Sequence, residues 1–264
     1  MNSKAKPVDQ ATLAKAGVGA APSVNPLVVV GDKLPDYIKD DGKSRGNENV
    51  TIEDLVVPRV EVVQALSPCL DESNTAAHIA GAKQGDLFNS LTRRLYGKTI
   101  VVVPVMFRKQ YLTWRDRDAG GGFRGAYDTL EQAAGVIKGL EKPEEWEAID
   151  TGQHLALVLN QDGSVDEVML SMAKTKMKVS RQWNSLVRQA GGDRFSRAYE
   201  IVGVKERNQK NQDYFNFAVR PIGFPPKEAY ERAAALYEDL AAGKINVTMD
   251  TSDVDAATPG KSEF

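Results

Sequence analysis

The longest run of apolar and β-branched positions lies near the middle of the chain. Residues 98–107 (KTIVVVPVMF) continue through 109–115 (KQYLTWR), and this pattern predicts one long, bent strand. Pro104 lies inside the run, and proline cannot donate to a strand ladder. We therefore expect an edge or a β-bulge at Pro104.

Two hairpins follow the long strand. Residues 154–160 and 165–173 flank the sequence Gln161-Asp162-Gly163-Ser164, which is typical of a tight turn. Residues 197–205 and 213–222 flank a second polar loop. The second hairpin's last strand alternates, so that Phe215, Phe217 and Val219 are expected on a buried face, opposite Tyr214, Asn216 and Arg220.

Helical periodicity appears in three places. Ser180 is expected to cap a helix over 180–190, with Trp183 on its apolar stripe. Asp128 and Glu131 resemble a capping box for a helix over 129–140. The clearest helix spans 226–242, and Gly243 ends it. Its apolar stripe comprises Tyr230, Ala233, Ala234, Tyr237 and Leu240.

The order of these elements is long strand, hairpin, helix, hairpin, followed by a C-terminal helix. This order predicts a mainly β protein with helices (α+β), and specifically an OB-fold-like five-stranded Greek-key barrel. Residues 116–153 would then form a long insertion between the first two strands. In this fold such a loop and the face of strands two and three commonly hold nucleic acid. A mixed α+β sheet remains the alternative.

Composition divides the chain into three parts. Residues 1–49 are rich in Ala, Gly, Lys, Asp, Asn and Pro and predict a mostly disordered arm. Residues 50–245 form the predicted domain, and residues 246–264 a flexible acidic tail. No apolar run approaches the roughly 18–20 residues of a membrane helix, and Cys69 is the single cysteine. We expect a cytoplasmic protein, in the host cell if it is viral, with no membrane association.

Charge is segregated along the chain, although the net charge is only −2. Residues 93–124 carry +6 and residues 174–220 carry +7, which leaves −15 for the rest. Such segregation is expected when a basic surface meets phosphates. A solvated charged face is the alternative explanation.

Aromatic residues are interleaved with these bases, as in proteins that stack single-stranded bases on aromatic rings. Tyr111, Trp114 and Tyr214 are the best stacking candidates. Lys174, Lys176 and Lys178 would project to one side if the preceding strand continued, and such a row suits phosphates. The predicted nucleic-acid-binding residues are Arg108, Lys109, Tyr111, Trp114, Arg115, Arg117, Arg124, Lys174, Lys176, Lys178, Arg181, Tyr199, Lys205, Tyr214 and Arg220.

The sequence contains no complete motif of a phosphate-binding loop or a zinc site. The three Gly-Lys-Ser/Thr triplets lack the first glycine of a phosphate-binding loop. His78 and His154 lie far apart and have no cysteine pair nearby, so a zinc site is not predicted. The sequence therefore predicts no catalytic residues, no cofactor and no metal.

Several short motifs are similar to a known family. They are 46–50 (GNENV), Asp54-Leu55, Pro58-Arg59, 64–68 (QALSP), 81–86 (GAKQGD), 102–105 (VVPV), Trp114-Arg115 and 178–186 (KVSRQWNSL). Together they resemble a family of bacteriophage single-stranded DNA-binding proteins. The resemblance implies an OB-type fold and a role in protecting replication or recombination intermediates. An acidic tail ending in Glu263-Phe264 is similar in plan to tails that bind replication proteins.

The favoured hypothesis is a sequence-independent protein that binds single-stranded DNA. One alternative is a single-strand annealing protein of recombination, and another is a non-catalytic structural or host-interaction protein. Exposed strand edges leave homo-oligomerisation open. The preference between DNA and RNA is not predicted.

Overall fold

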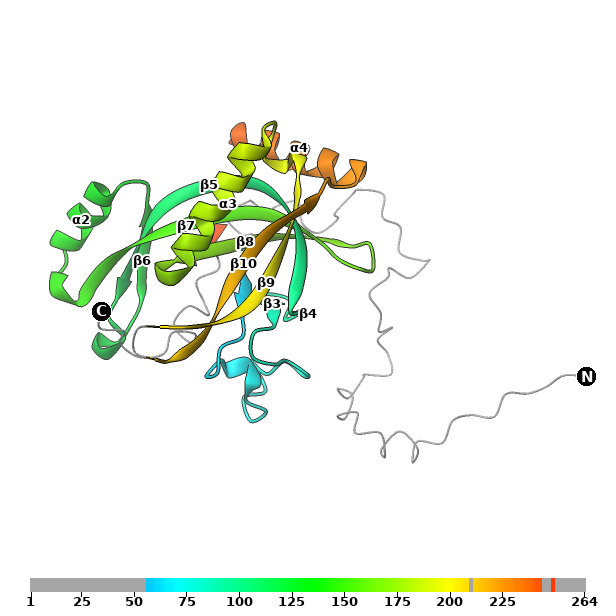
Figure 1. The fold of residues 1–264 in the computed structure, drawn as a ribbon. Coiled ribbons are helices and arrows are strands. Elements are labelled where there is room, and N and C mark those ends of the chain that lie inside the picture. The colour runs from blue at the N-terminus through cyan, green and yellow to red at the C-terminus, as the bar shows by residue number, and fades with distance from the viewer. Residues whose placement is uncertain (1–55, 209–210, 244–247, 250–264) are drawn as a thin grey trace, which may run out of the picture. The chain divides into compact units, whose positions relative to one another are not determined.

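The computed structural model describes residues 56–208, 211–243 and 248–249 of the 264-residue chain. These residues form a mainly β structure with helices, which confirms the α+β class (Figure 1). Its strands are β1 (Val56–Val57), β2 (Val60–Val62), β3 (Leu87–Asn89), β4 (Leu95–Gly97), β5 (Thr99–Arg115), β6 (Phe123–Tyr127), β7 (Trp146–Leu159), β8 (Val165–Ala173), β9 (Ala198–Arg207), β10 (Asp213–Gly223) and β11 (Thr248–Met249). Its helices are α2 (Leu130–Lys138), α3 (Met177–Ala190) and α4 (Lys227–Ala241).

The predicted arm, 1–49, and most of the predicted tail lie outside the described residues. Thr248–Met249 is the described part of the tail segment, and it pairs in parallel with Val56–Val57. None of the helices in the described ranges is long and apolar enough to cross a membrane.

The central sheet has the strand order β10-β9-β5-β7-β8, and β6 pairs with the second half of β5. The long strand is confirmed. So is the irregularity at Pro104, because the pairing of β5 with β7 shifts between Pro104 and Met106. A bulge there lets the chain bend without a ladder hydrogen bond from the proline nitrogen.

Both hairpins are confirmed, but the predicted insertion is not a loop. β7 begins at Trp146, and it pairs with β5 as far as Arg115↔Trp146. With β6 it forms a three-stranded arm, packed by α2, that extends the sheet beyond its central part. The strand over 146–153 was not predicted because that segment is only partly apolar and does not alternate between apolar and polar residues.

α4 is confirmed, with Pro226 as its N-cap residue. Ala229, Ala233, Leu236 and Leu240 are its buried residues, whereas Tyr230 and Tyr237 of the predicted stripe are exposed. In α2 the capping box is formed by Thr129 and Gln132 rather than by Asp128 and Glu131. Thr129 is the N-cap and Gln132 the N3 residue, so the capping box lies one residue later than predicted.

The five core strands do not close into the predicted barrel, since β8 and β10 are not paired within the described residues. The segment that contains β2 bridges the gap. On one side the Met169 amide donates to the Pro58 carbonyl at 2.8 Å. On the other, the Gln64 side-chain amide exchanges two hydrogen bonds with the backbone of Phe215, at 2.8 and 2.9 Å. Val60 and Val62 add their side chains to the core.

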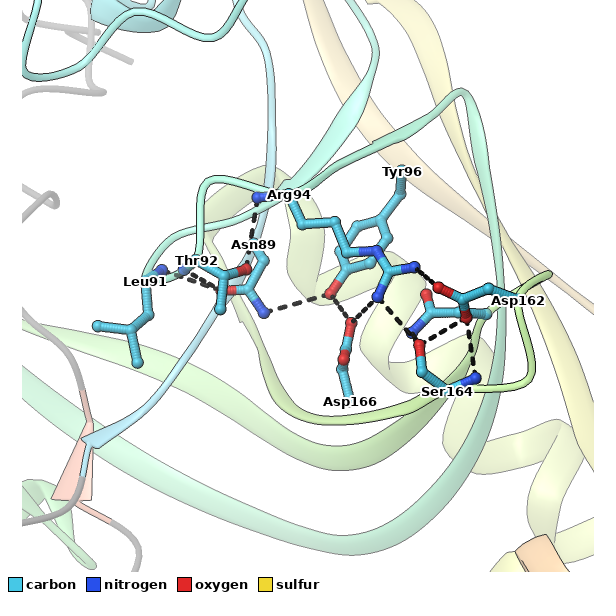
Figure 2. Close-up of polar contacts among 9 residues, drawn as sticks. Asn89, Leu91, Thr92, Arg94, Tyr96, Asp162, Ser164 and Asp166 are labelled. Carbon is cyan, nitrogen blue, oxygen red and sulfur yellow. Dashed lines mark hydrogen bonds and ion pairs between the residues drawn. The ribbon is translucent and has the colours of Figure 1, made fainter. Parts of the chain in front are cut away.

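Polar contacts attach the β3–β4 hairpin to the turn between β7 and β8 (Figure 2). The Arg94 guanidinium donates to Asp162 at 2.6 Å and to Ser164 at 3.0 Å. The Tyr96 hydroxyl donates to Asp166 at 2.9 Å. Hydrogen bonds from the Ser164 hydroxyl and amide, followed by that from Arg94, lower the pKa of Asp162 to about 2. The turn is thereby linked to residues about 70 positions earlier.

Two apolar layers occupy the two faces of the central sheet. One face packs against α3 and the β2 segment, and Trp183 and Tyr199 lie in its core. The other face packs against α4, through Val103, Leu155 and Leu157. Gly203 permits a further close approach, because a Cβ atom there would overlap the Gly85 carbonyl oxygen.

Candidate nucleic-acid interface

The start of α3 differs from the prediction. β8 ends at Ala173, and Lys174–Lys176 forms a 3-10 turn in which Lys174 has a φ of 49°. The helix then begins at Met177, so Ser180 lies inside it rather than at its cap. The predicted row of three lysines on one strand is therefore wrong, because the strand does not continue.

The three lysines point to different partners. Lys174 Nζ lies 3.5 Å from Glu147 Oε2. Lys176 Nζ lies 4.6 Å from the centroid of the Phe217 ring, and burial lowers the pKa of this ammonium. Lys178 Nζ donates to Glu206 at 2.7 Å.

α3 packs closely on β7 because Gly152 has no side chain. A Cβ atom at Gly152 would overlap the Ser180 hydroxyl. Two residues along the same face, His154 is fully buried and stacks on Trp183 with ring centroids 4.6 Å apart. Its Nε2 lies 2.8 Å from the Ser180 oxygen.

Arg194 completes this buried contact. Its Nη2 lies 2.9 Å from His154 Nδ1 and donates to Asn184 Oδ1 at 2.9 Å. A guanidinium can only donate, so Nδ1 of His154 accepts and the ring proton is on Nε2. Burial, followed by the charge of Arg194, lowers the pKa of His154 well below its usual value. Burial also lowers the pKa of Arg194, to about 10.

Beyond this contact, the first turn of α3 and the start of β7 leave an open groove of about 470 Å³. We call it the α3 groove. Three cationic side chains and two carboxylates lie along it. Its lining residues are Glu147, Ala148, Ile149, Asp150, Lys174, Thr175, Met177, Lys178 and Arg181.

β5 brings two more predicted residues beside the groove. Tyr111 pairs with Asp150 across the ladder. Lys109 Nζ lies 3.3 Å from Asp150 Oδ2 and 5.3 Å from the centroid of the Tyr111 ring. The two side chains therefore share the sheet face that carries Asp150, as residues two apart on a strand do. The structure thus brings together Lys109, Tyr111, Lys174, Lys178 and Arg181.

Glu206 joins the groove to the β9–β10 hairpin. It accepts hydrogen bonds from Lys178, from the Tyr214 hydroxyl at 2.6 Å and from Asn216 at 2.9 Å. Burial alone would raise the pKa of Glu206, but the three donated hydrogen bonds outweigh it and lower the pKa. Tyr214 is half-buried, and its hydroxyl already donates a hydrogen bond to Glu206.

Many of the other predicted cations are paired with carboxylates. Lys205 lies 2.6 Å from Asp213, Arg220 pairs with Glu200, and Arg115 Nε donates to Glu145 at 2.8 Å. Exposed pairs of this kind contribute little to stability, but they reduce the positive field. Among the residues that the structure describes, Arg108, Arg124 and Arg181 are exposed and have no ion pair.

Two aromatic predictions have different outcomes. Tyr199 is only 1% exposed and packs edge-on against Trp183, so it cannot stack on a base. It points inward because it lies on the same face of β9 as Ile201, which is fully buried. Trp114 is half-buried and packs on Phe123 at the far end of the arm, with ring centroids 4.8 Å apart.

Three predicted residues cannot be placed in this way. The backbone of Arg117 belongs to a 3-10 turn, but its side chain is outside the described residues. Glu263 and Phe264 also lie outside them. Within the described part of the chain, no three His, Cys, Asp or Glu side chains are close enough to hold a metal ion.

The carboxylates of the groove were missed by the sequence analysis. Glu147 and Asp150 both lie in residues 116–153, which were predicted to form an insertion. Residues 147–152 (EAIDTG) do not alternate between apolar and polar positions, so the sequence held no period-2 signal for this part of β7.

The fold and groove describe a mainly β protein with a cation-lined, open surface beside a sheet. Residues 28–246 match the family described as Pam3 phage gp34-like protein, and the chain therefore belongs to that family. No curated protein and no solved structure matches the chain.

Proposed function

We propose that this protein binds single-stranded DNA without sequence preference, through the α3 groove. The observation that carries the proposal is the clustering of Lys174, Lys178 and Arg181 in one open groove next to Lys109 and Tyr111. Binders of single strands combine such a cationic path with aromatic rings on which bases stack.

The strand connections support the proposal. β5 pairs with both β7 and β9, and α3 connects β8 to β9. An OB-fold, a partly open five-stranded Greek-key barrel, is the fold that we infer from this order. Its first-to-second and fourth-to-fifth strand connections commonly hold oligonucleotides. Here the corresponding parts are the β5–β6–β7 arm and the β9–β10 hairpin, and the groove lies against both through Asp150 and Glu206.

The position of α4 directs the ligand to this side. OB-folds also use the outer face of their second and third strands. In this protein Leu155, Leu157 and Met169 of β7 and β8 pack in one apolar cluster with Ala233, Leu236 and Leu240 of α4. A ligand on that face would have to displace the helix. Membership of a phage family fits a role with replication or recombination intermediates.

The test is fluorescence anisotropy with a labelled oligo-dT of about 30 nucleotides and the matching duplex, at two salt concentrations. We expect salt-dependent binding to the single strand. Replacing all three groove cations (K174A/K178A/R181A) should weaken binding and lower the salt slope by about 2, since each phosphate contact contributes about 0.7. A matched control removes three exposed cations elsewhere (K83A/K227A/R232A).

Two outcomes would contradict the proposal. Absence of binding to either nucleic acid at low salt would overturn it outright. Equal losses in the two triple variants would mean that general charge, rather than the groove, attracts DNA. Added magnesium should produce no cleavage, because we propose a binding protein and not an enzyme.

A further inference from the structure

Phe224 is a large aromatic residue that the fold leaves in water. Its side chain is 72% exposed, directly after β10. The guanidinium of Arg197 lies 4.2 Å from the centroid of its ring. A ring exposed to this degree contributes little to the core, and an arginine stacked on it adds a positive charge at the same point.

A basic stripe runs along α3 from the groove towards the segment that carries Arg197. Lys178, Arg181, Ser185 and Arg188 are all exposed, and their spacing of three and four residues places them along one side of α3. At 1.5 Å per residue, the seven residues from Arg181 to Arg188 extend the path beyond the groove by about 10 Å. Arg181 also lines the groove, so the stripe begins within it.

The segment that follows α3 reaches Phe224. After α3 the chain turns at Gly191 and Gly192, and Asp193 then accepts a hydrogen bond from the Tyr230 hydroxyl of α4 at 3.1 Å. Arg197, four residues later, contacts Phe224 itself. Figure 1 shows α3 running towards α4 in this way.

We propose that Phe224 and Arg197 form a second contact for the same single strand, which leaves the α3 groove, follows the basic stripe of α3 and stacks a base on Phe224. The inference rests on the proposed function and extends it from one groove to a path. The chemistry favours a nucleic acid over an apolar protein segment, because the exposed ring lies at the end of a line of cations and has a guanidinium on it.

The test compares two oligo-dT lengths, about 6 and about 16 nucleotides, within the range of site sizes for OB-folds. In F224A the affinity for the longer strand should fall about 5- to 150-fold, which corresponds to the loss of one base stack. The affinity for the shorter strand, which can occupy the groove alone, should not change. The matched control is L66A, which removes an equally exposed apolar side chain elsewhere.

A second variant reports the contact between a base and residue 224 by fluorescence. F224W should keep the affinity for the longer strand, and its added tryptophan emission should be quenched by unlabelled oligo-dT. R188A and R197A should each lower the salt slope for the longer strand by about 0.7.

The outcomes separate the two proposals. If the wild-type protein binds neither oligonucleotide, the proposed function fails. If it binds both and F224A binds both equally well, only the second contact fails. If F224A instead changes the oligomeric state, measured by light scattering, while DNA binding is unchanged, Phe224 belongs to an interface between copies of the chain and the inference is wrong.

Discussion

The two faces of the β5–β7 ladder are covered by two different kinds of helix contact. Under α4 the contact is apolar, with Ala233 and Leu236 among the aliphatic side chains of the sheet. Under α3 an apolar cluster that includes Val179 and Trp183 is joined by buried polar contacts among His154, Ser180 and Arg194. The α4 side is covered by the helix, whereas the α3 side ends in an open groove.

The difference follows from what each contact requires. Apolar packing is non-directional, so a helix with small and aliphatic residues can lie along the whole strand surface. Buried polar groups must be matched by partners with defined geometry. α3 meets β7 through defined polar contacts near Gly152 and His154, and the open groove lies beside its first turn. We expect both faces to contribute to the free energy of folding, because each carries a buried apolar cluster, and we expect binding on the α3 side only.

The largest effect should come from the α4 side. Leu157→Ala removes a fully buried side chain from the apolar contact, and we expect a loss of about 2–5 kcal/mol in the free energy of unfolding, measured with urea. Leu130→Ala, at an exposed position, is the control and should change it by less than about 0.5 kcal/mol. Similar values for the two variants would contradict the assignment of this face to the core.

Next in size is the loss of the buried arginine on the α3 side. Arg194→Ala leaves His154 Nδ1 and Asn184 Oδ1 without this donor, and we expect a cost of about 1–3 kcal/mol in the free energy of unfolding. Asn184→Ala removes one acceptor only and should cost less. If Arg194→Ala were neutral, the polar contact would not hold α3 in place.

Protonation of His154 gives a smaller and pH-dependent effect. Its pKa in the folded protein lies well below the usual value of about 6.5, so the unfolded chain binds a proton that the folded protein refuses. The free energy of unfolding is therefore unaffected by His154 above about pH 6.5. It decreases as the pH falls below that value, by at most about 1.4 kcal/mol per pH unit. Urea unfolding between pH 7.5 and 5.5 measures this slope.

His154→Gln is the comparison for that slope, because glutamine does not titrate. Its free energy of unfolding should change less with pH over the same range, whatever its absolute stability. Parallel curves for the two proteins would mean that folding does not lower the pKa of His154, which would contradict a buried neutral ring whose Nδ1 accepts from Arg194.

The smallest effect on stability should come from the groove itself. Glu147→Gln breaks an exposed pair with Lys174, and such pairs contribute about 0–1 kcal/mol. The freed ammonium should instead strengthen oligo-dT binding by up to about fivefold and make it more salt-dependent. Glu238→Gln, on the exposed side of α4, is the control. Weaker binding in Glu147→Gln would indicate that the carboxylate itself contacts the ligand.

Elements with a strong local signal were predictable. The apolar run of β5, the turn at Asp162-Gly163 and the period of α4 depend on neighbours along the chain, and all three are present in the structure. The bulge at Pro104 was also predictable, because it follows from the missing amide hydrogen of one residue.

The candidate site was predictable only in part. Lys174, Lys178 and Arg181 were selected from their charge, and they do share one groove. The same charge count selected Arg220 and Lys205, which are paired with carboxylates that no spacing rule indicated. Tyr199 was selected for its type, whereas the side of β9 on which it lies placed it in the core.

The sequence alone therefore determined the α+β class, the long bent strand, both hairpins and the C-terminal helix. These elements follow from side-chain periodicity and turn residues, which are local properties of a segment. Tertiary structure decided that β2 bridges β8 and β10, that α4 covers one face, and that His154 meets Arg194 across 40 positions. These contacts join segments far apart in the chain, and they depend on how the sheet bends and on which faces then meet. That physical dependence also determined where the groove lies.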